Sequence, residues 1–275
     1  MLYLHALHIS FTGPAPLSPS QLQTLSDNRY VVIKDWACVQ QTASIRQDTM
    51  DVSAAGYSFD SRTGNSGRVG SAALDTSVRN SRQCPLYPPP SNSAGSVSTR
   101  ADLIFAVNAL RSQLQASRTL ALPHLEPFET ELSYLLYPRG GHYKRHLDNS
   151  KRREGWKLQG RQAADGGSFC GGRTRRVVSF ILYLNAKWKA SDGGCLRVFP
   201  PHEHIDHDDE ASSAGYTEDI TPEGGTLVLF MSSDVEHLVR ETHAERQCVV
   251  GWFREYSEER VPDRDVMSTR AVLPV

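Results

Sequence analysis

The sequence predicts a mostly β fold with flanking α-helices, in which two antiparallel sheets form a double-stranded β-helix (jelly-roll) core. Helical patterns are concentrated in the N-terminal half of the chain. From Glu131 onward, short apolar segments alternate with turn residues, which is typical of antiparallel strands. Many short strands behind a helical N-terminus favour a double sheet with helices packed outside it.

Three segments have helical signals. Ser18-Pro19 begins a short capped helix, because proline fits the first helical position. A weaker pattern spans about residues 37–50. Thr99 opens a clearer helix, whose apolar residues form one stripe that we interpret as scaffold. The stripe consists of Leu103, Val107, Leu110 and Leu114.

Six segments are predicted to be strands from their β-branched, aromatic and leucine content. One of them, Val177–Leu184, is almost entirely apolar, so we expect both of its faces to be covered. The six are Tyr30–Ile33, Leu132–Tyr137, Val177–Leu184, Cys195–Phe199, Thr226–Met231 and Cys248–Phe253.

The chain is long enough for one sizeable core with appendages. We place an N-terminal helical and loop region at residues 1–124, the core domain at 125–258 and a tail at 259–275. Residues 52–98 are rich in Gly, Ser, Pro, Asn and Arg, so we expect loops or a flexible segment there. Such a segment is either a surface insertion, which we favour, or a lid over a substrate.

Charge and cysteine content exclude some classes of function. With 30 Lys and Arg against 31 Asp and Glu, no global basic field predicts nucleic-acid binding. No run of about 18 apolar residues predicts a membrane span. The five cysteines are scattered, which favours free thiols in a reducing compartment. Because residues 1–11 lack the features of a signal peptide, we expect a cytoplasmic or nuclear protein.

The motif His146-Leu147-Asp148 carries the first chemical signal. On an extended segment, His146 and Asp148 share one face because side chains alternate. A distant histidine, His237, completes a set of two imidazoles and one carboxylate. Such a set leaves metal positions open, which is typical of a non-haem Fe(II) oxygenase. Any one histidine alone is better explained as an ordinary core or surface residue, but the trio framed by strands favours the metal site.

Arg246 adds a second signal. Residues 241–245 form a plausible turn that would return Arg246 to the side of the sheet that carries His237. Alternation then gives it the same face as Cys248, Val250 and Trp252. Because a guanidinium forks onto a carboxylate, we expect a 2-oxo acid that chelates iron and places its far carboxylate on Arg246. The alternative is a surface arginine at the start of a strand.

Seven stretches between about residues 125 and 258 keep the order and spacing of a known family. They are Tyr137–Asn149, Ile181–Asn185, Trp188, Gly193–Pro200, Asp219–Pro222, Thr226–Phe230 and His237–Phe253. They resemble the catalytic domain of the prolyl 4-hydroxylase family of Fe(II)/2-oxoglutarate dioxygenases. The resemblance is closest to the hypoxia-inducible-factor prolyl hydroxylase branch.

The resemblance implies a role for each matching residue. His146, Asp148 and His237 would be the iron ligands. Arg246 would bind the distal carboxylate of 2-oxoglutarate, and Tyr183 would donate a hydrogen bond to that carboxylate. The alternative for Tyr183 is an ordinary strand tyrosine in the core. The pocket would be lined by Tyr137, Tyr143 and Trp252. The resemblance also implies O2 as co-substrate, L-ascorbate as reductant, succinate and CO2 as products, and a prolyl residue of a protein or peptide as substrate.

Two features depart from the family pattern. The glycine-rich turn before Tyr143 is one residue shorter than in the animal enzymes. Val78-Arg79-Asn80-Ser81 stands where that branch carries an Arg-x-Asp segment near the substrate, so the acidic residue is missing here. The identity of the substrate is therefore open even if the chemistry is not.

Two further stretches are rich in chemically active residues. His202–Glu210 either holds a second metal ion or is a solvated acidic loop, and we favour the loop. A basic run after the metal motif either attracts an acidic peptide to the site or is a solvated loop. Its members are Lys151, Arg152, Arg153, Lys157, Arg161, Arg173, Arg175 and Arg176.

Rival interpretations keep this fold and change the function. The nearest has the same chemistry on a free amino acid or another small molecule. A non-catalytic binding module is disfavoured by the intact ligand set. A zinc hydrolase would leave Arg246 and Tyr183 without a purpose. A halogenase is disfavoured because Asp148 fills the position that a halide needs.

Overall fold

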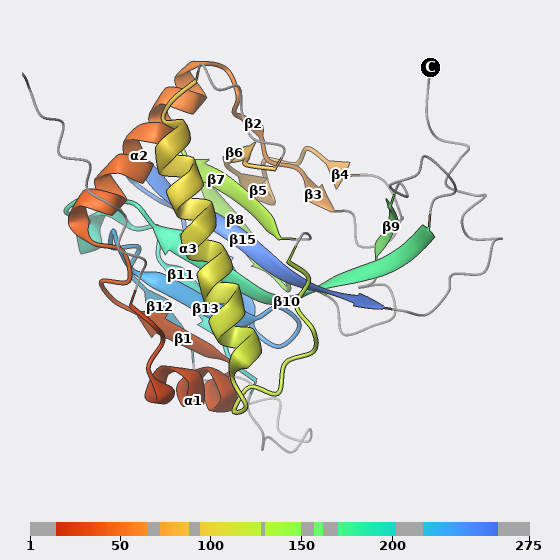
Figure 1. Ribbon diagram of the computed structural model, residues 1–275. Helices are drawn as coiled ribbons and strands as arrows, with labels where there is room; N and C mark the ends of the chain where they lie inside the picture. The colour runs from red at the N-terminus through yellow and green to blue at the C-terminus, as the bar shows by residue number, and fades with distance from the viewer. Residues whose placement is uncertain are drawn as a thin grey trace, which may run out of the picture.

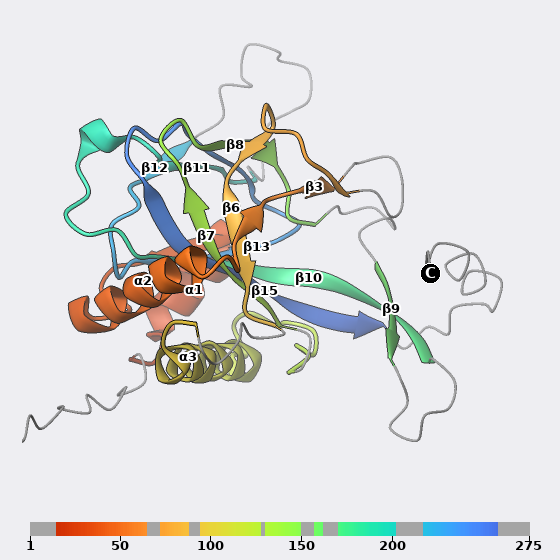
Figure 2. The ribbon, with the colours of Figure 1, turned by 90° about the horizontal axis from the view of Figure 1, so that it is seen from above.

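The computed structural model describes residues 15–64, 72–87, 94–127, 130–149, 157–161, 170–201 and 217–257. Helices, a large antiparallel sheet and a smaller antiparallel sheet are stacked in layers (Figure 1 and Figure 2). This arrangement confirms the predicted jelly-roll core with outer helices. In the described part of the chain, no helix is long and apolar enough to cross a membrane.

The predicted helices are present. Helix α1 (Pro19–Asn28) begins with a capping box in which Ser18 and Gln21 satisfy each other's backbone N–H groups. Helix α2 (Val39–Ala54) extends beyond the predicted end, and α3 (Val97–Ala116) begins slightly before Thr99. The predicted stripe of α3 is buried, and α2 and α3 both lie in front of the large sheet in Figure 1.

The large sheet contains five of the six predicted strands. Its β10 and β15 project beyond the other strands, and β9 pairs with the projecting end of β10 (Figure 2). In spatial order the sheet consists of β1 (Tyr30–Ile33), β13 (Leu227–Met231), β10 (Cys170–Tyr183), β15 (Arg246–Ser257), β7 (Glu131–Tyr137), β6 (Arg82–Pro85) and β2 (Phe59–Asp60), with β9 (Lys157–Arg161) beside β10.

The smaller sheet contains the sixth predicted strand and four that the sequence patterns did not predict. In spatial order it consists of β12 (Glu218–Ile220), β11 (Leu196–Phe199), β14 (Glu236–Val239), β8 (His142–His146) and β5 (Arg79–Asn80). A separate pair is formed by β3 (Thr63–Gly64) and β4 (Ala72–Ala73), and a short 3₁₀ helix, η2 (Ala190–Asp192), precedes β11.

Two hydrophobic clusters fill the spaces between the three layers. One joins the helices to the large sheet and includes Phe180 and Leu182, and the other joins the two sheets and includes Ile181 and Tyr183. These four residues alternate along β10, so successive side chains enter opposite clusters. The prediction that both faces of Val177–Leu184 are covered is therefore confirmed.

Residues 52–98 differ from the predicted loops. Strand β6 pairs with β7 and extends the large sheet, and β5 pairs with β8 at the edge of the smaller sheet. The loop prediction is wrong for these two segments, because long-range pairing forms strands that lack apolar alternation. Residues 65–71 and 88–93 lie outside the described part of the chain.

A buried polar junction ties α2, α3 and β7 together. The carboxylate of Asp48 on α2 accepts hydrogen bonds from Arg100 Nη1 on α3 at 2.7 Å and from the Tyr134 hydroxyl on β7 at 2.6 Å. Asp48 is 1% exposed and Arg100 3%. Such a pair fixes the position of the helices only because each partner satisfies the other.

Candidate active site

The three predicted metal ligands converge where the smaller sheet faces the large one. His146 ends β8, and it lies opposite His237 of β14 in the antiparallel register. Asp148 follows β8. Its two carboxylate oxygens are 3.6 Å from His146 Nε2 and 3.9 Å from His237 Nε2. The three ligand atoms lie within 4.8 Å of one another, which suits one metal ion between them.

Backbone carbonyls orient both imidazoles. His146 Nδ1 is 2.8 Å from the carbonyl oxygen of Lys144, and His237 Nδ1 is 3.2 Å from that of Val235. When Nδ1–H donates to the carbonyl, Nε2 keeps its lone pair for a metal. Burial, together with the charge of His146, lowers the pKa of His237 to about 4. Its ring is therefore neutral at neutral pH, as a metal ligand must be.

Asp148 is held by a short chain of hydroxyl groups. The Ser179 hydroxyl on β10 donates to Asp148 Oδ2 at 2.7 Å and lies 2.8 Å from the Ser232 hydroxyl. Burial opposes ionisation of Asp148, but His237 and His146 more than offset it and hold the pKa of the carboxyl well below its usual range. The site thus offers two imidazole nitrogens and one ionised oxygen, a donor set that fits Fe(II).

Arg246, at the start of β15, is buried in the same cavity and pairs with no carboxylate of the described residues. It is 1% exposed, and its Nε and Nη2 have no hydrogen-bond partner among the described residues. Its Nη1 reaches only the weakly accepting sulfur of Cys248, at 3.6 Å. A buried guanidinium without a counter-charge is costly, so these donors suit an anionic ligand such as the far carboxylate of 2-oxoglutarate.

The surroundings hold the Arg246 side chain in place. Its guanidinium carbon is 4.8 Å from the centre of the Tyr137 ring and 5.1 Å from that of Tyr183. Gly194 adopts a positive φ of 66°, and a Cβ there would lie 3.1 Å from Arg246 Cδ. Tyr183 stands beside Arg246 rather than on the cavity wall, and its buried hydroxyl also lacks a partner in the described part of the chain.

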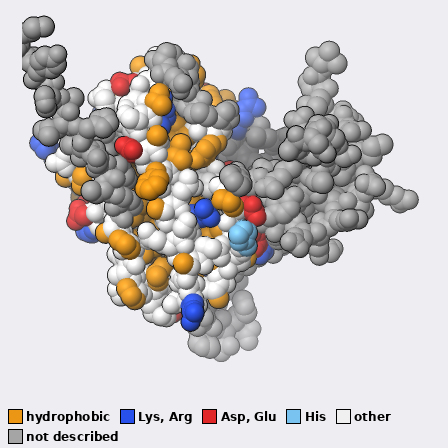
Figure 3. Space-filling model, in the orientation of Figure 1, with side chains coloured by type: hydrophobic (Ala, Val, Ile, Leu, Met, Phe, Trp, Pro, Cys, Tyr) orange, Lys and Arg blue, Asp and Glu red, His pale blue; other side chains and the backbone are white. Residues whose placement is uncertain are grey.

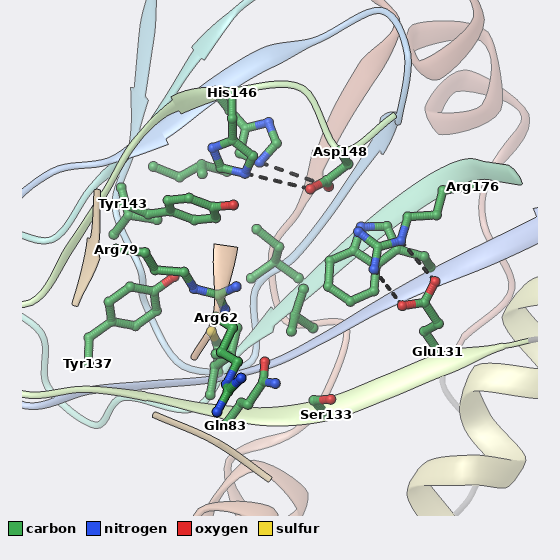
Figure 4. A pocket seen from close by; sticks show the side chains of 18 of the residues that line it. Arg62, Arg79, Gln83, Glu131, Ser133, Tyr137, Tyr143, His146, Asp148 and Arg176 are labelled. Atoms are coloured by element: carbon green, nitrogen blue, oxygen red, sulfur yellow. Dashed lines mark hydrogen bonds and ion pairs between the residues drawn. The ribbon is translucent and has the colours of Figure 1, made fainter. Parts of the chain in front are cut away.

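The cavity has a volume of about 960 Å³ and contains the predicted pocket residues Tyr137, Tyr143 and Trp252 in its wall. The Tyr143 ring stacks on His146 with centroids 3.7 Å apart. The Arg176 guanidinium lies 3.7 Å from the centre of the Trp252 ring and forms a two-pronged ion pair with Glu131 (Figure 4). Apolar rings and paired charges therefore border the metal site on this side.

Sequence reasoning missed three contributors to the site. Ser179 was predicted only as part of an apolar strand, although a lone hydroxyl between Val178 and Phe180 was a visible signal. The pairing of Arg176 with Glu131 joins β10 to β7, and no local pattern indicates it. Arg79 lines the cavity from β5. The resemblance placed its segment near the substrate, but the segment was predicted to be a loop and Arg79 was given no role.

The two other stretches singled out in the sequence are described only in small part. His202–Glu210 lies outside the described residues, and so do Lys151, Arg152 and Arg153. Of the basic run, Arg175 and Arg176 have described side chains, and they pair with Glu255 and Glu131. These two arginines therefore do not present free positive charge to a peptide.

Comparison with known proteins agrees with this geometry. Residues 132–254 match the model of the 2OG-Fe(II) oxygenase superfamily. Prolyl 3-hydroxylase OGFOD1 of Xenopus laevis is 35% identical over 91 residues, which are 32% of this chain and 17% of that protein. This chain therefore matches only a small part of that relative's length.

Solved structures share the fold. A Pseudomonas putida prolyl-4-hydroxylase superposes with a TM-score of 0.61 at 23% identity, over 86% of this chain and 98% of that one. A prolyl hydroxylase from Trichoplax adhaerens, solved with a peptide of the hypoxia inducible factor oxygen degradation domain, gives 0.60 at 18% identity, over 85% and 86% of the two chains. At such identities the likeness shows the fold alone.

The segment that matches the family model contains the three metal ligands, Arg246 and Tyr183. The sheets, the clustered ligand atoms and the family match lead to one conclusion. Residues 132–254 form a domain of the 2OG-Fe(II) oxygenase superfamily, with its His–Asp–His iron-binding triad intact.

Proposed function

We propose that this chain is an Fe(II)- and 2-oxoglutarate-dependent dioxygenase that hydroxylates prolyl residues of a protein and releases succinate and CO2. The observation that carries the co-substrate assignment is Arg246, a buried cation whose Nε and Nη2 have no partner in the described part of the chain. It lines the same cavity as the triad.

Each residue then has a defined task. His146, Asp148 and His237 would hold Fe(II), which supplies the redox chemistry that activates O2 when it is bound. Arg246 receives the distal carboxylate of 2-oxoglutarate as a planar fork and fixes the orientation of the co-substrate relative to the metal. Ser179 keeps the Asp148 carboxylate in one orientation.

Tyr183 is placed to assist Arg246 as a neutral donor. Burial raises the pKa of the Tyr183 hydroxyl, although the charge of Arg246 opposes the shift. The hydroxyl therefore keeps its proton at neutral pH and can donate a hydrogen bond to a carboxylate oxygen. A fully buried donor without a partner in the described part of the chain costs free energy, which a bound carboxylate would recover.

The prolyl substrate is supported by resemblance rather than by geometry. The core sequence resembles prolyl 4-hydroxylases, and one relative that matches part of this chain is a prolyl 3-hydroxylase. We propose hydroxylation at C4, because the motifs between Tyr137 and Asn149 follow the 4-hydroxylase pattern and are closest to the hypoxia-inducible-factor branch. We also propose L-ascorbate as the reductant that returns iron to Fe(II), as in that family.

Mass spectrometry of cell-extract proteins treated with the enzyme, Fe(II), 2-oxoglutarate and ascorbate tests this proposal. We expect added oxygen on proline, and amino-acid analysis of the hydrolysed product should show 4-hydroxyproline. 3-Hydroxyproline would keep the substrate and change the position. Oxygen found only on free amino acids or other small molecules would overturn the protein substrate.

A further inference from the structure

Arg79 places a second unpaired cation in the active-site cavity. Strand β5 pairs with β8, so Arg79 lies opposite Tyr143 in the register. Its guanidinium carbon is 4.7 Å from the centre of the Tyr143 ring, which itself stacks on the metal ligand His146. Arg79 is 9% exposed and extends into the cavity between Tyr143 and Tyr137 (Figure 4).

Neutral groups hold this guanidinium in position. Arg79 Nε donates to the Ser81 hydroxyl at 2.9 Å, and that hydroxyl donates to the Ser61 hydroxyl at 2.9 Å. Both serines are buried. The contacts fix the direction of the side chain without neutralising its charge, and no ion pair of Arg79 occurs among the described residues.

Three other arginines of the cavity have a counter-charge or a task. Arg176 pairs with Glu131 and Arg145 pairs with Glu236. Arg246 receives the co-substrate. The remaining acid of the cavity wall, Asp148, is committed to the metal site. Within the described ranges, no acid of the cavity wall is therefore left to compensate the positive charge of Arg79.

One more cation lies near Arg79. Figure 4 shows Arg62 beside it in the pocket, and Arg62 is exposed and likewise makes no ion pair within the described ranges. The side chains of Arg62 and Arg79 thus both line the cavity that contains the triad.

A substrate that fills this space removes the water that solvates Arg79. Its Nη groups then need an acceptor from the substrate, and a carboxylate matches the planar fork in both shape and charge. We infer that the substrate carries an acidic residue close to the hydroxylated proline, with its carboxylate on Arg79. This inference rests on the proposed prolyl hydroxylation and names the class of peptide within it.

Two matched panels of synthetic proline peptides test the inference. One panel carries Asp at each position near the proline in turn, and the other carries Asn, which has the same shape without the charge. Hydroxylation is measured as kcat/KM with saturating 2-oxoglutarate. We expect Asp at one position to exceed Asn there by about tenfold or more, the value of a charge-assisted contact.

Variants assign the preference to Arg79. Arg79→Gln should bring the Asp-to-Asn ratio close to one. Ser81→Asp should also bring the ratio close to one, because the new carboxylate would pair with Arg79 from within the protein. Ser81→Asn is the matched control, and its ratio should stay closer to the wild-type ratio than that of Ser81→Asp.

Two failures are distinguishable. If the wild-type enzyme hydroxylates both panels equally, or if Arg79→Gln keeps the preference, the inference about Arg79 is wrong and prolyl hydroxylation stands. If neither panel gains oxygen while 2-oxoglutarate is still converted to succinate, the prolyl substrate is wrong and the inference falls with it.

Discussion

His146 and His237 face each other across two neighbouring antiparallel strands, β8 and β14, with ring centroids 4.2 Å apart. The register of this pair brings two ligands together although they lie 91 positions apart in the sequence (237 minus 146). Asp148 completes the set from the loop after β8. The metal site therefore depends on sheet pairing, and none of the three ligands is a member of either hydrophobic cluster.

Asp148→Ala should abolish turnover and weaken Fe(II) binding, because it removes the anionic ligand from the site. The protein should stay folded, since Asp148 belongs to neither hydrophobic cluster. Anaerobic calorimetry with Fe(II), combined with thermal unfolding, measures both effects. Asp27→Ala on the exposed surface of α1 is the control and should change neither. Wild-type activity in Asp148→Ala would remove the metal assignment.

Ser179→Ala should weaken Fe(II) binding by about tenfold or more, since outer partners of metal ligands have effects of that order. The cause is the lost hydrogen bond to Asp148 Oδ2, which leaves the carboxylate free to rotate. Ser133→Ala is the matched control, because Ser133 lines the cavity from β7 without touching the triad. Equal Fe(II) affinities in the two variants would show that Ser179 does not orient the ligand.

Arg246→Lys should act as a defect in co-substrate binding. Lysine keeps the charge and loses the fork, and the loss of one charge-assisted hydrogen bond, about 1.5–3 kcal/mol, raises the 2-oxoglutarate requirement by about ten- to a hundredfold. Arg246→Ala should be worse. Excess 2-oxoglutarate should partly rescue the lysine variant, and Fe(II) affinity without co-substrate should change little.

The measurement is succinate formation against 2-oxoglutarate concentration. Arg240→Lys is the control, because Arg240 is a half-exposed arginine that pairs with Asp219 outside the cavity. Superimposable curves for the wild type and all variants would mean that Arg246 is an ordinary strand arginine.

Asp48→Asn should destabilise the fold without acting on the chemistry. It leaves the buried Arg100 without its counter-charge, and breaking such a pair costs about 3–5 kcal/mol. Urea unfolding followed by circular dichroism measures the change in the free energy of unfolding. The control is Asp51→Asn, an exposed acid on the same helix. A loss below about 1 kcal/mol, the value of an exposed pair, would show that the junction does not hold α2 and α3.

The exposed apolar side chains on α2 and α3 do not line the active-site cavity. Hydrophobic side chains are visible over the face that α2 and α3 present in Figure 3, and Val39 on α2 and Phe105 on α3 are 80% and 65% exposed. They lie on helices, whereas the cavity is lined by strands and the segments next to them. Substitutions there serve as neutral positions for activity.

Much of this structure follows from local sequence. The stripe of α3 and the strands β7, β10, β13 and β15 have apolar patterns that can be recognised in the sequence without knowledge of the tertiary structure. The triad could be predicted because two of its ligands share a strand-like spacing and the third follows another strand. The face that Arg246 shares with Trp252 came from simple alternation along β15.

The rest could not be predicted, for physical reasons. Strand β8 reads His-Tyr-Lys-Arg-His, a polar sequence without alternation, and it is a strand because β14 and β5 pair with it. Strand β6 ends in Pro85 and joins the large sheet through its pairing with β7. The positions of Arg79 and Ser81 depend on the pairing of β5 with β8. They could not be predicted, because the register of distant strands is not encoded locally.

The central claim is that this chain splits O2 between 2-oxoglutarate and a prolyl substrate. Turnover under ¹⁸O2 with Fe(II), 2-oxoglutarate and the protein substrate, followed by mass spectrometry of both products, tests it most directly. We expect one ¹⁸O atom in succinate and one in hydroxyproline, and neither product in Asp148→Ala. Hydroxyl oxygen that comes wholly from water, or the absence of succinate with the wild-type protein, would contradict the account.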